Sequence, residues 1–128
     1  MKKIDKLPDD AVKILNSEDY VDRKGNIYSF DNRDGHSRDL FIREQTRLNG
    51  YKYCNVKYCI DGEYMNITKK VNKIVATAFI PNPDNLPIVM HKNKNKLDNR
   101  VENLQWGAIS ESRKDDFRYH KGKPKNIL

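Results

Sequence analysis

The stretch VMHKNKNKLDNRVENLQWG, residues 89–107, is the most informative part of this chain. A short apolar segment is followed by a polar loop with one histidine and four asparagines, and then by a second apolar segment that contains a tryptophan. Residues 88–90 and 104–106 predict two short strands. His91 follows the first strand directly, and Met90 precedes it, where a site for a hard metal ion would have an oxygen ligand.

The composition describes a small and basic chain. Its 128 residues suit one domain, and its net charge is +7 with a pI near 9.4. A small protein with this balance usually meets a polyanion, and we expect nucleic acid, since no basic amphipathic helix favours a membrane surface. No apolar run reaches the length of a membrane span, and MKKIDKLPDD at the start lacks the apolar core of a signal peptide. We therefore expect a cytoplasmic protein with no membrane partner.

The two cysteines, Cys54 and Cys59, do not predict a disulfide or a zinc site. Their odd spacing places them on opposite faces of a strand, and no second cysteine pair completes a metal site. We expect two reduced thiols that fill partly buried positions.

The first part of the chain, residues 1–48, is predicted to be a β-rich element. Residues 20–21 and 27–30 flank the sequence RKGN, a glycine-containing turn, which predicts a β-hairpin. Residues 31–39 form a polar loop. Residues 9–16, DDAVKILN, predict a short helix that Asp9 or Asp10 would cap.

The second part, residues 49–128, is predicted to begin with a strand over 51–60 after the Asn49–Gly50 turn. Asp61–Gly62 is a strong hairpin signal, and residues 64–68 form the returning strand. A helix is predicted over 69–80, because apolar residues recur at helical spacing and prolines follow. These apolar residues are Val71, Ile74, Val75, Ala78 and Phe79. A second helix is predicted over 108–119, with Ser110 as its cap.

Three segments resemble the HNH endonuclease family, in the version found in phage and intron homing endonucleases. They are KIVATAFIPNP (73–83), VMHKNKNKLDNRVENLQW (89–106) and ES (111–112), and they lie in a run from Lys70 to Ser112 that covers about a third of the chain. A weaker resemblance links YVDRKGNIYSF (20–30) to the small β-element that often precedes such domains. The resemblance implies an α+β fold, in which N-terminal β-hairpin elements are followed by a ββα-metal unit. It also implies a phage or mobile-element origin.

The resemblance implies a role for several residues of the loop. In the family, a histidine at the end of the first strand activates a water as general base, and an asparagine orients that histidine. A divalent ion stabilises charge on the leaving oxygen. By position, His91 corresponds to the general base and Asn103 to the orienting asparagine, while Asn99 and Arg100 lie in the loop that closes the site. Asn103 could instead brace the loop through backbone hydrogen bonds.

The two metal ligands of the family do not carry over. Met90 stands where an Asp or Asn is expected, and Ser112 stands where the helix has an asparagine or histidine. A thioether is a soft ligand that does not suit Mg²⁺. Lys94 stands where the family has a glycine. We therefore expect no bound cofactor, and Mg²⁺ or Mn²⁺ would be required only if the protein is active. In that case Asp115 or Asp116 would supply a metal ligand in place of the missing ones. The alternative is that both aspartates are ordinary solvated charges.

Basic residues of the loop and of the N-terminal part are predicted to contact DNA. Such contacts position a duplex without reading its sequence. The alternative is a loop whose charge only keeps it in water. The predicted contact residues are Lys92, Lys94, Lys96, Arg100, Arg38, Arg43 and Arg47.

Three functions fit these observations. We favour an HNH-family protein that binds double-stranded DNA and whose metal-dependent cleavage is weakened or lost. One alternative is an active nickase with a rerouted metal ligand. The other is an inhibitor module that reuses an inactive HNH scaffold to bind a host or phage protein. The sequence leaves the oligomeric state open.

Overall fold

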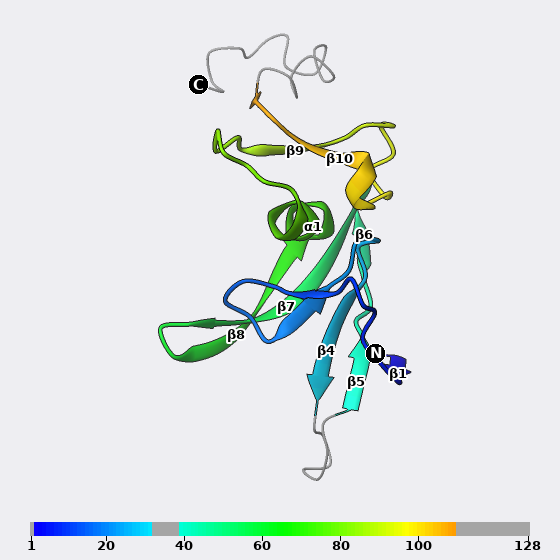
Figure 1. The fold of residues 1–128 in the computed structure, drawn as a ribbon, viewed down its shortest axis with the longest axis vertical. Coiled ribbons are helices and arrows are strands. Elements are labelled where there is room, and N and C mark those ends of the chain that lie inside the picture. The colour runs from blue at the N-terminus through cyan, green and yellow to red at the C-terminus, as the bar shows by residue number, and fades with distance from the viewer. Residues whose placement is uncertain (1, 32–38, 110–128) are drawn as a thin grey trace.

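The computed structural model describes residues 2–31 and 39–109. Within these ranges the chain forms a five-stranded antiparallel sheet, a three-stranded antiparallel sheet, a two-stranded hairpin and one α-helix (Figure 1). The five-stranded sheet has the order β1-β5-β4-β3-β2. Its strands are β1 (Lys2–Ile4), β2 (Val12–Lys13), β3 (Asp19–Val21), β4 (Ile27–Asp31) and β5 (Asp39–Ile42).

The later elements follow in the order that the sequence predicts. The three-stranded sheet has the order β6-β7-β8, and α1 comes directly after β8. The hairpin β9–β10 closes the described chain, with a 3-10 turn, η1, between its strands. The bounds are β6 (Thr46–Leu48), β7 (Tyr51–Ile60), β8 (Glu63–Lys70), α1 (Val71–Phe79), β9 (Ile88–His91), η1 (Val101–Asn103) and β10 (Leu104–Gly107).

The predicted hairpins are confirmed. The pairing of β3 with β4 matches the hairpin expected around RKGN, and β7 pairs with β8 across Asp61–Gly62. Asn49 and Asp61 have φ values of 55° and 53°, the left-handed conformation that the tight turns of hairpins require. The turn residues therefore fix the register of both long strands.

The helix α1 is confirmed at nearly its predicted length. Val71, Ile74 and Val75 are buried, as the apolar spacing predicts. The helix begins at Val71 rather than at residue 69, because Lys69 and Lys70 still pair with β7. The helix ends at Phe79, because the next residue, Ile80, precedes Pro81 and has an extended backbone.

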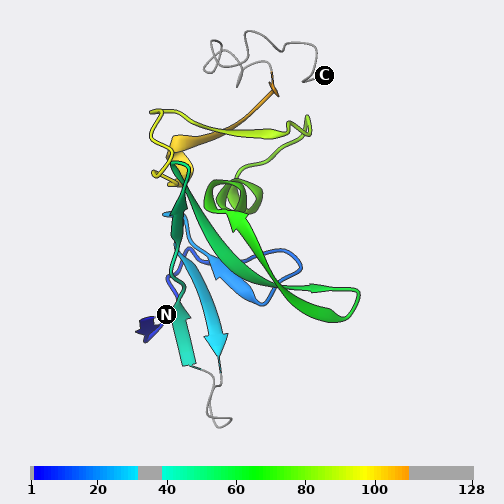
Figure 2. The ribbon, with the colours of Figure 1, turned by 180° about the vertical axis from the view of Figure 1, so that it is seen from behind.

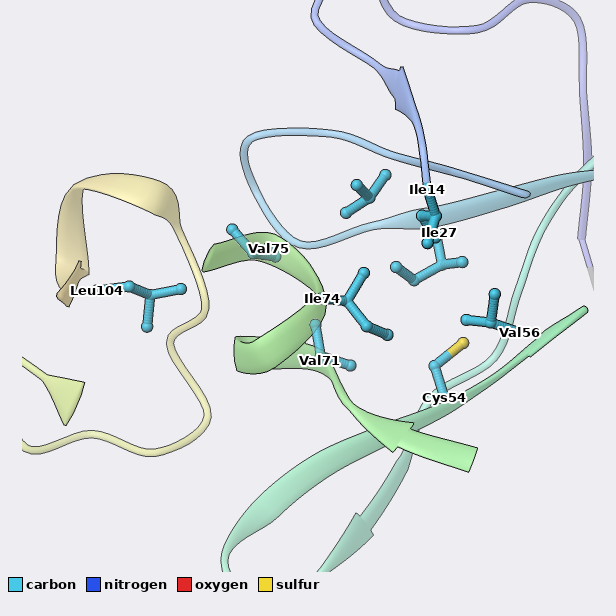
Figure 3. Close-up of a cluster of buried hydrophobic side chains, with 9 residues drawn as sticks. Ile14, Ile27, Cys54, Val56, Val71, Ile74, Val75 and Leu104 are labelled. Atoms are coloured by element: carbon cyan, nitrogen blue, oxygen red, sulfur yellow. The ribbon is translucent and has the colours of Figure 1, made fainter. Parts of the chain in front are cut away.

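One hydrophobic core joins both parts of the chain (Figure 3). In this core α1 lies between the strands on one side and the β9–β10 hairpin on the other (Figures 1 and 2). The division at residue 48 stays a prediction, but residues from both sides of it share this core. The core residues are Ile14, Val21, Ile27, Cys54, Val56, Val71, Ile74, Val75 and Leu104.

The helix predicted over residues 9–16 is wrong. Val12 and Lys13 form β2 and pair with Val21 and Tyr20. Asn16 has a φ of 59°, which a right-handed helix excludes. Cross-strand pairing therefore overrides the weak local preference for a helix, which is the usual outcome for so short a segment.

The prediction for the cysteines is confirmed. Cys54 is buried, Cys59 is half-buried, and both are free thiols. Burial raises the pKa of the Cys54 thiol to about 11, so this residue acts as a core filler and not as a nucleophile. Among the described residues, no helix has the length and apolarity that a membrane crossing requires.

A buried carboxylate joins the two larger sheets. The side chain of Asp19 is only 1% exposed, and its Oδ2 accepts a hydrogen bond from the backbone N–H of Lys57 on β7 at 2.9 Å. The Nε of Arg43 lies 3.1 Å from the same oxygen. Burial raises the pKa of Asp19, and the Lys57 N–H and the Arg43 guanidinium oppose that rise. The carboxylate therefore needs both partners.

We expect Asp19→Ala to lower the free energy of unfolding by about 3 kcal/mol, because it leaves the Lys57 N–H without its acceptor and Arg43 without its ion-pair partner. Urea denaturation measures the change. The matched control is Asp39→Ala, which breaks a solvent-facing ion pair with Lys3 (3.4 Å) and should cost less than about 1 kcal/mol. Equal losses in the two variants would contradict the structural role of Asp19.

Candidate functional site

The β9–β10 hairpin carries the loop that the sequence singles out. Its register pairs His91 with Leu104 and Val89 with Trp106, so His91 stands at the end of β9 as predicted. Leu104 is buried in the core, and Nε1 of Trp106 donates a hydrogen bond to the carbonyl of Ile80 at 3.0 Å. The hairpin is therefore fixed to the end of α1.

His91 is held by an asparagine of the loop. The histidine is 8% exposed, and its Nε2 lies 2.8 Å from Oδ1 of Asn99. An amide oxygen only accepts hydrogen bonds, so this pairing places the proton of the neutral ring on Nε2. The lone pair of Nδ1 is then left to accept a proton, which is the state that a general base requires.

The orienting role expected for Asn103 falls to Asn99 instead. Asn103 accepts a hydrogen bond from the N–H of Asn93 at 3.0 Å, and its Nδ2 donates to the carbonyl of Asp98 at 2.9 Å. These bonds brace the loop, which is the alternative that the sequence left open for this residue. The loop folds back between residues 92 and 103, and this brings position 99 to the ring.

The β3–β4 turn supports Asn99 from behind. Asn99 is 4% exposed, and a Cβ added to Gly25 would lie 3.2 Å from its Cβ and 3.3 Å from its carbonyl oxygen. The N–H of Val101 donates to the carbonyl of Arg23 at 2.9 Å. Gly25, with a φ of +93°, therefore permits a close approach that a larger residue would block. The glycine of RKGN signals the turn in the sequence, but nothing there signals this contact.

A local ion pair shapes the tip of the loop. Arg100 donates from Nε and Nη2 to the two carboxylate oxygens of Asp98, both at 2.8 Å. These hydrogen bonds hold the pKa of the Asp98 carboxyl well below its usual range. The charge of Arg100 is therefore largely matched within the loop.

Lys94 adopts a glycine-like backbone conformation. Its φ is 67°, at the position where the family has a glycine. A side chain in this conformation costs about 1 kcal/mol. The loop keeps its shape at that cost. The side chain of Lys94 lines a pocket beside His91.

A basic pocket opens beside His91. It has a volume of about 710 Å³, and its walls come from the start of β7, the junction of β8 with α1, β9 and the loop. Five of the described lining residues are lysines, and none is an aspartate or glutamate. The lining residues are Tyr51, Thr68, Lys69, Lys70, Asn72, Lys73, Pro87, Ile88, Val89, Met90, His91, Lys94 and Lys96.

Only some of the lysines that line this pocket were predicted from the sequence. Lys94 and Lys96 were predicted DNA contacts, but Lys69, Lys70 and Lys73 were missed. They look like ordinary solvent-facing charges at a strand end and a helix start, and only the fold brings them to the loop.

The other predicted contact residues have different places. Lys92 is exposed on the loop and Arg47 is exposed on β6. The side chain of Arg43 is only 18% exposed and contacts Asp19, so it does not join the pocket. Arg38, Ser112, Asp115 and Asp116 lie outside the described residues, as does most of the helix predicted over 108–119.

The described residues around His91 do not fit a divalent metal ion. Met90 lines the pocket with a thioether, and lysines supply its charge. Within residues 2–31 and 39–109 there is no group of three or more His, Cys, Asp or Glu side chains that could hold a metal. Hard cations need several oxygen ligands, and the described walls offer no carboxylate.

Comparisons with known proteins find similarity to HNH endonucleases. An uncharacterized HNH endonuclease of Acanthamoeba polyphaga mimivirus is 48% identical over 46 residues, which are 34% of this chain and 12% of that protein. A second one from the same virus is 24% identical over 106 residues, 82% of this chain and 29% of that protein. The chain is thus similar in sequence to HNH endonucleases. It spans less than a third of the length of these curated relatives, and no family model matches it.

A solved structure has a fold similar to that of this chain. The structure, titled "DNA binding and cleavage by the HNH homing endonuclease I-HmuI", aligns with a TM-score of 0.62 and 20% sequence identity. The alignment covers 85% of this chain and 58% of the other. The predicted α+β class is confirmed, with β9 and β10 as the two strands of the expected ββα unit.

We expect Asn99→Ala to release the ring of His91, because Nε2 then loses the amide oxygen that lies 2.8 Å from it. The NMR chemical shifts of the two ring nitrogens measure the change in tautomer and orientation. The matched control is Asn103→Ala, which removes an amide from the same loop whose hydrogen bonds go to Asn93 and Asp98. A larger change in the control than in Asn99→Ala would return the orienting role to Asn103.

Proposed function

We propose that this chain binds double-stranded DNA at the lysine-lined pocket beside His91, and that its metal-dependent cleavage of phosphodiesters is weak or lost. The observation that carries this proposal is the pocket itself. It combines a buried and oriented histidine with five lysines, and no carboxylate lines its described walls. The overall charge of +7 favours the same polyanionic partner.

Binding follows from the basic walls. Lysines that contact phosphates release counterions from DNA, which gives affinity that falls steeply with salt. The solved structure with a similar fold is titled for a protein that binds and cleaves DNA, and this supports a DNA partner for the present chain. A cytoplasmic location and a phage or mobile-element origin remain predictions.

Weak cleavage follows from the missing ligands. His91 retains the contact that would let it act as a base, but a base alone does not neutralise the charge that develops on the leaving oxygen. Met90 offers a soft thioether where an oxygen would be needed to hold Mg²⁺ or Mn²⁺. The described residues therefore include a candidate general base, His91, but no set of ligands for an ion that would stabilise the leaving group.

The N-terminal part has a supporting role in this proposal. We propose residues 1–48 as a β-rich element that braces the HNH-like part, residues 49–128. Its β3–β4 turn packs on Asn99 through Gly25 and accepts a hydrogen bond from Val101. It thereby helps to hold the asparagine that orients His91.

We expect salt-sensitive DNA binding without efficient cleavage. Fluorescence anisotropy with a labelled duplex in EDTA should give an affinity that falls by at least about tenfold between 50 and 200 mM KCl. Supercoiled plasmid with Mg²⁺ or Mn²⁺ should be nicked slowly or not at all, and any nicking should disappear in His91→Ala. Efficient nicking would contradict the loss of cleavage, and an absence of DNA binding would favour the inhibitor module.

We expect Met90→Asp combined with Ser112→Asn to gain binding of Mn²⁺, because the two changes restore the oxygen ligands that the family uses. Isothermal titration calorimetry measures the gain over the unchanged protein. The control pairs Ser112→Asn with Met65→Asp, which adds the same carboxylate at an exposed position on β8. If neither double variant binds the ion, the loop geometry no longer suits a metal.

A further inference from the structure

We propose that Lys70 and Lys96, gathered on the ring of Tyr51 beside His91, bind one phosphate group of the DNA backbone together. Their ammonium groups would take the place that a divalent ion has in HNH nucleases. The proposal rests on the proposed function and adds to it a defined phosphate site that does not need a metal.

Three distant segments meet at Tyr51. The Nζ of Lys70, at the end of β8, lies 4.0 Å from the centre of the Tyr51 ring, and the Nζ of Lys96, in the loop, lies 4.8 Å from it. The rings of Tyr51 and His91 are 6.4 Å apart, centre to centre, and inclined at 47°. All four residues line the same pocket, and the ring of Tyr51 is the element that both ammonium groups and the histidine ring share as a neighbour.

The loop and the β6–β7 turn hold Lys96 in this place. A Cβ added to Gly50 would lie 3.8 Å from Cδ of Lys96, so the stem of the lysine passes close to the turn that precedes Tyr51. The aromatic ring then receives the charged end. Lys96 is therefore positioned along its length, although the residue as a whole is exposed.

The pair carries positive charge that the described protein does not balance. In residues 2–31 and 39–109, neither ammonium group has a carboxylate within ion-pair distance. The negative face of the ring offsets part of their repulsion, but a ring carries no net charge. Lys70 also caps α1, whose first turn contains no acidic residue and adds a partial positive charge. A phosphodiester, with one negative charge and two free oxygens, complements this arrangement.

Two of the other lysines of the pocket have their own partners. Lys73 donates to the carbonyl of Pro87 at 3.3 Å and lies 5.2 Å from the centre of the Trp106 ring. Lys69 lies 5.5 Å from the centre of the Tyr58 ring. Lys70 and Lys96 instead lie over the same ring, that of Tyr51, and the ring of His91 is its neighbour. We therefore assign these two lysines to a single phosphate.

Two ammonium groups in place of a divalent ion would allow the site to bind DNA without cleaving it. Ammonium groups neutralise a phosphate and donate hydrogen bonds to its free oxygens. They do not supply the Lewis acidity with which a divalent ion activates water and stabilises a leaving oxygen. Binding at this site therefore does not require Mg²⁺, and Mg²⁺ competes with the lysines for the phosphate.

The test uses the whole chain and a labelled DNA duplex in EDTA. Lys70→Gln and Lys96→Gln should each lower the slope of log affinity against log salt by about 0.9, the value for one phosphate contact. The double variant should lose little more than either single variant, because both lysines hold the same phosphate. Circular dichroism melting checks that each variant is folded.

The matched control is Lys57→Gln. Lys57 also lies over a tyrosine ring, 5.0 Å from the centre of Tyr64, but on the β7–β8 hairpin and outside the pocket. For this variant, the slope of log affinity against log salt should stay at the wild-type value. An equal fall in the control, or additive losses in the double variant, would overturn the shared site.

A second measurement replaces KCl by MgCl₂ at constant ionic strength. The wild-type affinity should stay the same or fall, and a rise would overturn the metal-independent site. The outcomes separate the two proposals. If the wild type shows no salt-sensitive DNA binding, the proposed function fails; if it binds DNA and the pocket variants behave like Lys57→Gln, only the phosphate site fails.

Discussion

The burial of α1 between the sheets and the β9–β10 hairpin is the constraint on which the site depends. Val71, Ile74 and Val75 are buried in the shared core, and burial of each such side chain contributes about 1.5–3 kcal/mol. At the end of the helix, the carbonyl of Ile80 accepts the hydrogen bond of Trp106 and so fixes the hairpin. Its start opens into the basic pocket. One helix therefore fixes the position of the loop at its end and contributes to the positive charge of the pocket at its start.

The contact between His91 and Asn99 depends on the same packing. Asn99 is buried, and Nδ2 of its amide has no hydrogen-bond partner among the described residues, so its bond to the ring and its packing hold it. That packing comes from Gly25, which also lies close to Val71 of the core. The orientation of the histidine is thus a property of the whole core, reached through a turn that lies more than sixty residues away in the chain.

The sequence predicted those features that local chemistry determines. Apolar spacing determines α1, and Asp61–Gly62 determines a hairpin. It did not predict which asparagine of the loop faces His91, because spacing alone does not say how a loop of this length folds back. It also missed Lys70, whose position in the pocket arises only when β8, β7 and the loop meet. The wrong helix over 9–16 has the same cause, since pairing with β3 decided it.

The charge of the pocket separates two ways of handling a phosphate. A divalent ion at this place requires carboxylates to hold it, and carboxylates would draw nearby lysines into ion pairs. The described walls have no carboxylate, and within the described residues neither Lys70 nor Lys96 has an ion-pair partner. A bound divalent ion and an unpaired lysine pair are therefore alternative ways to neutralise a phosphate at this place. Both lysines lie on the ring of Tyr51, and this placement is what supports the second alternative for the proposed phosphate site.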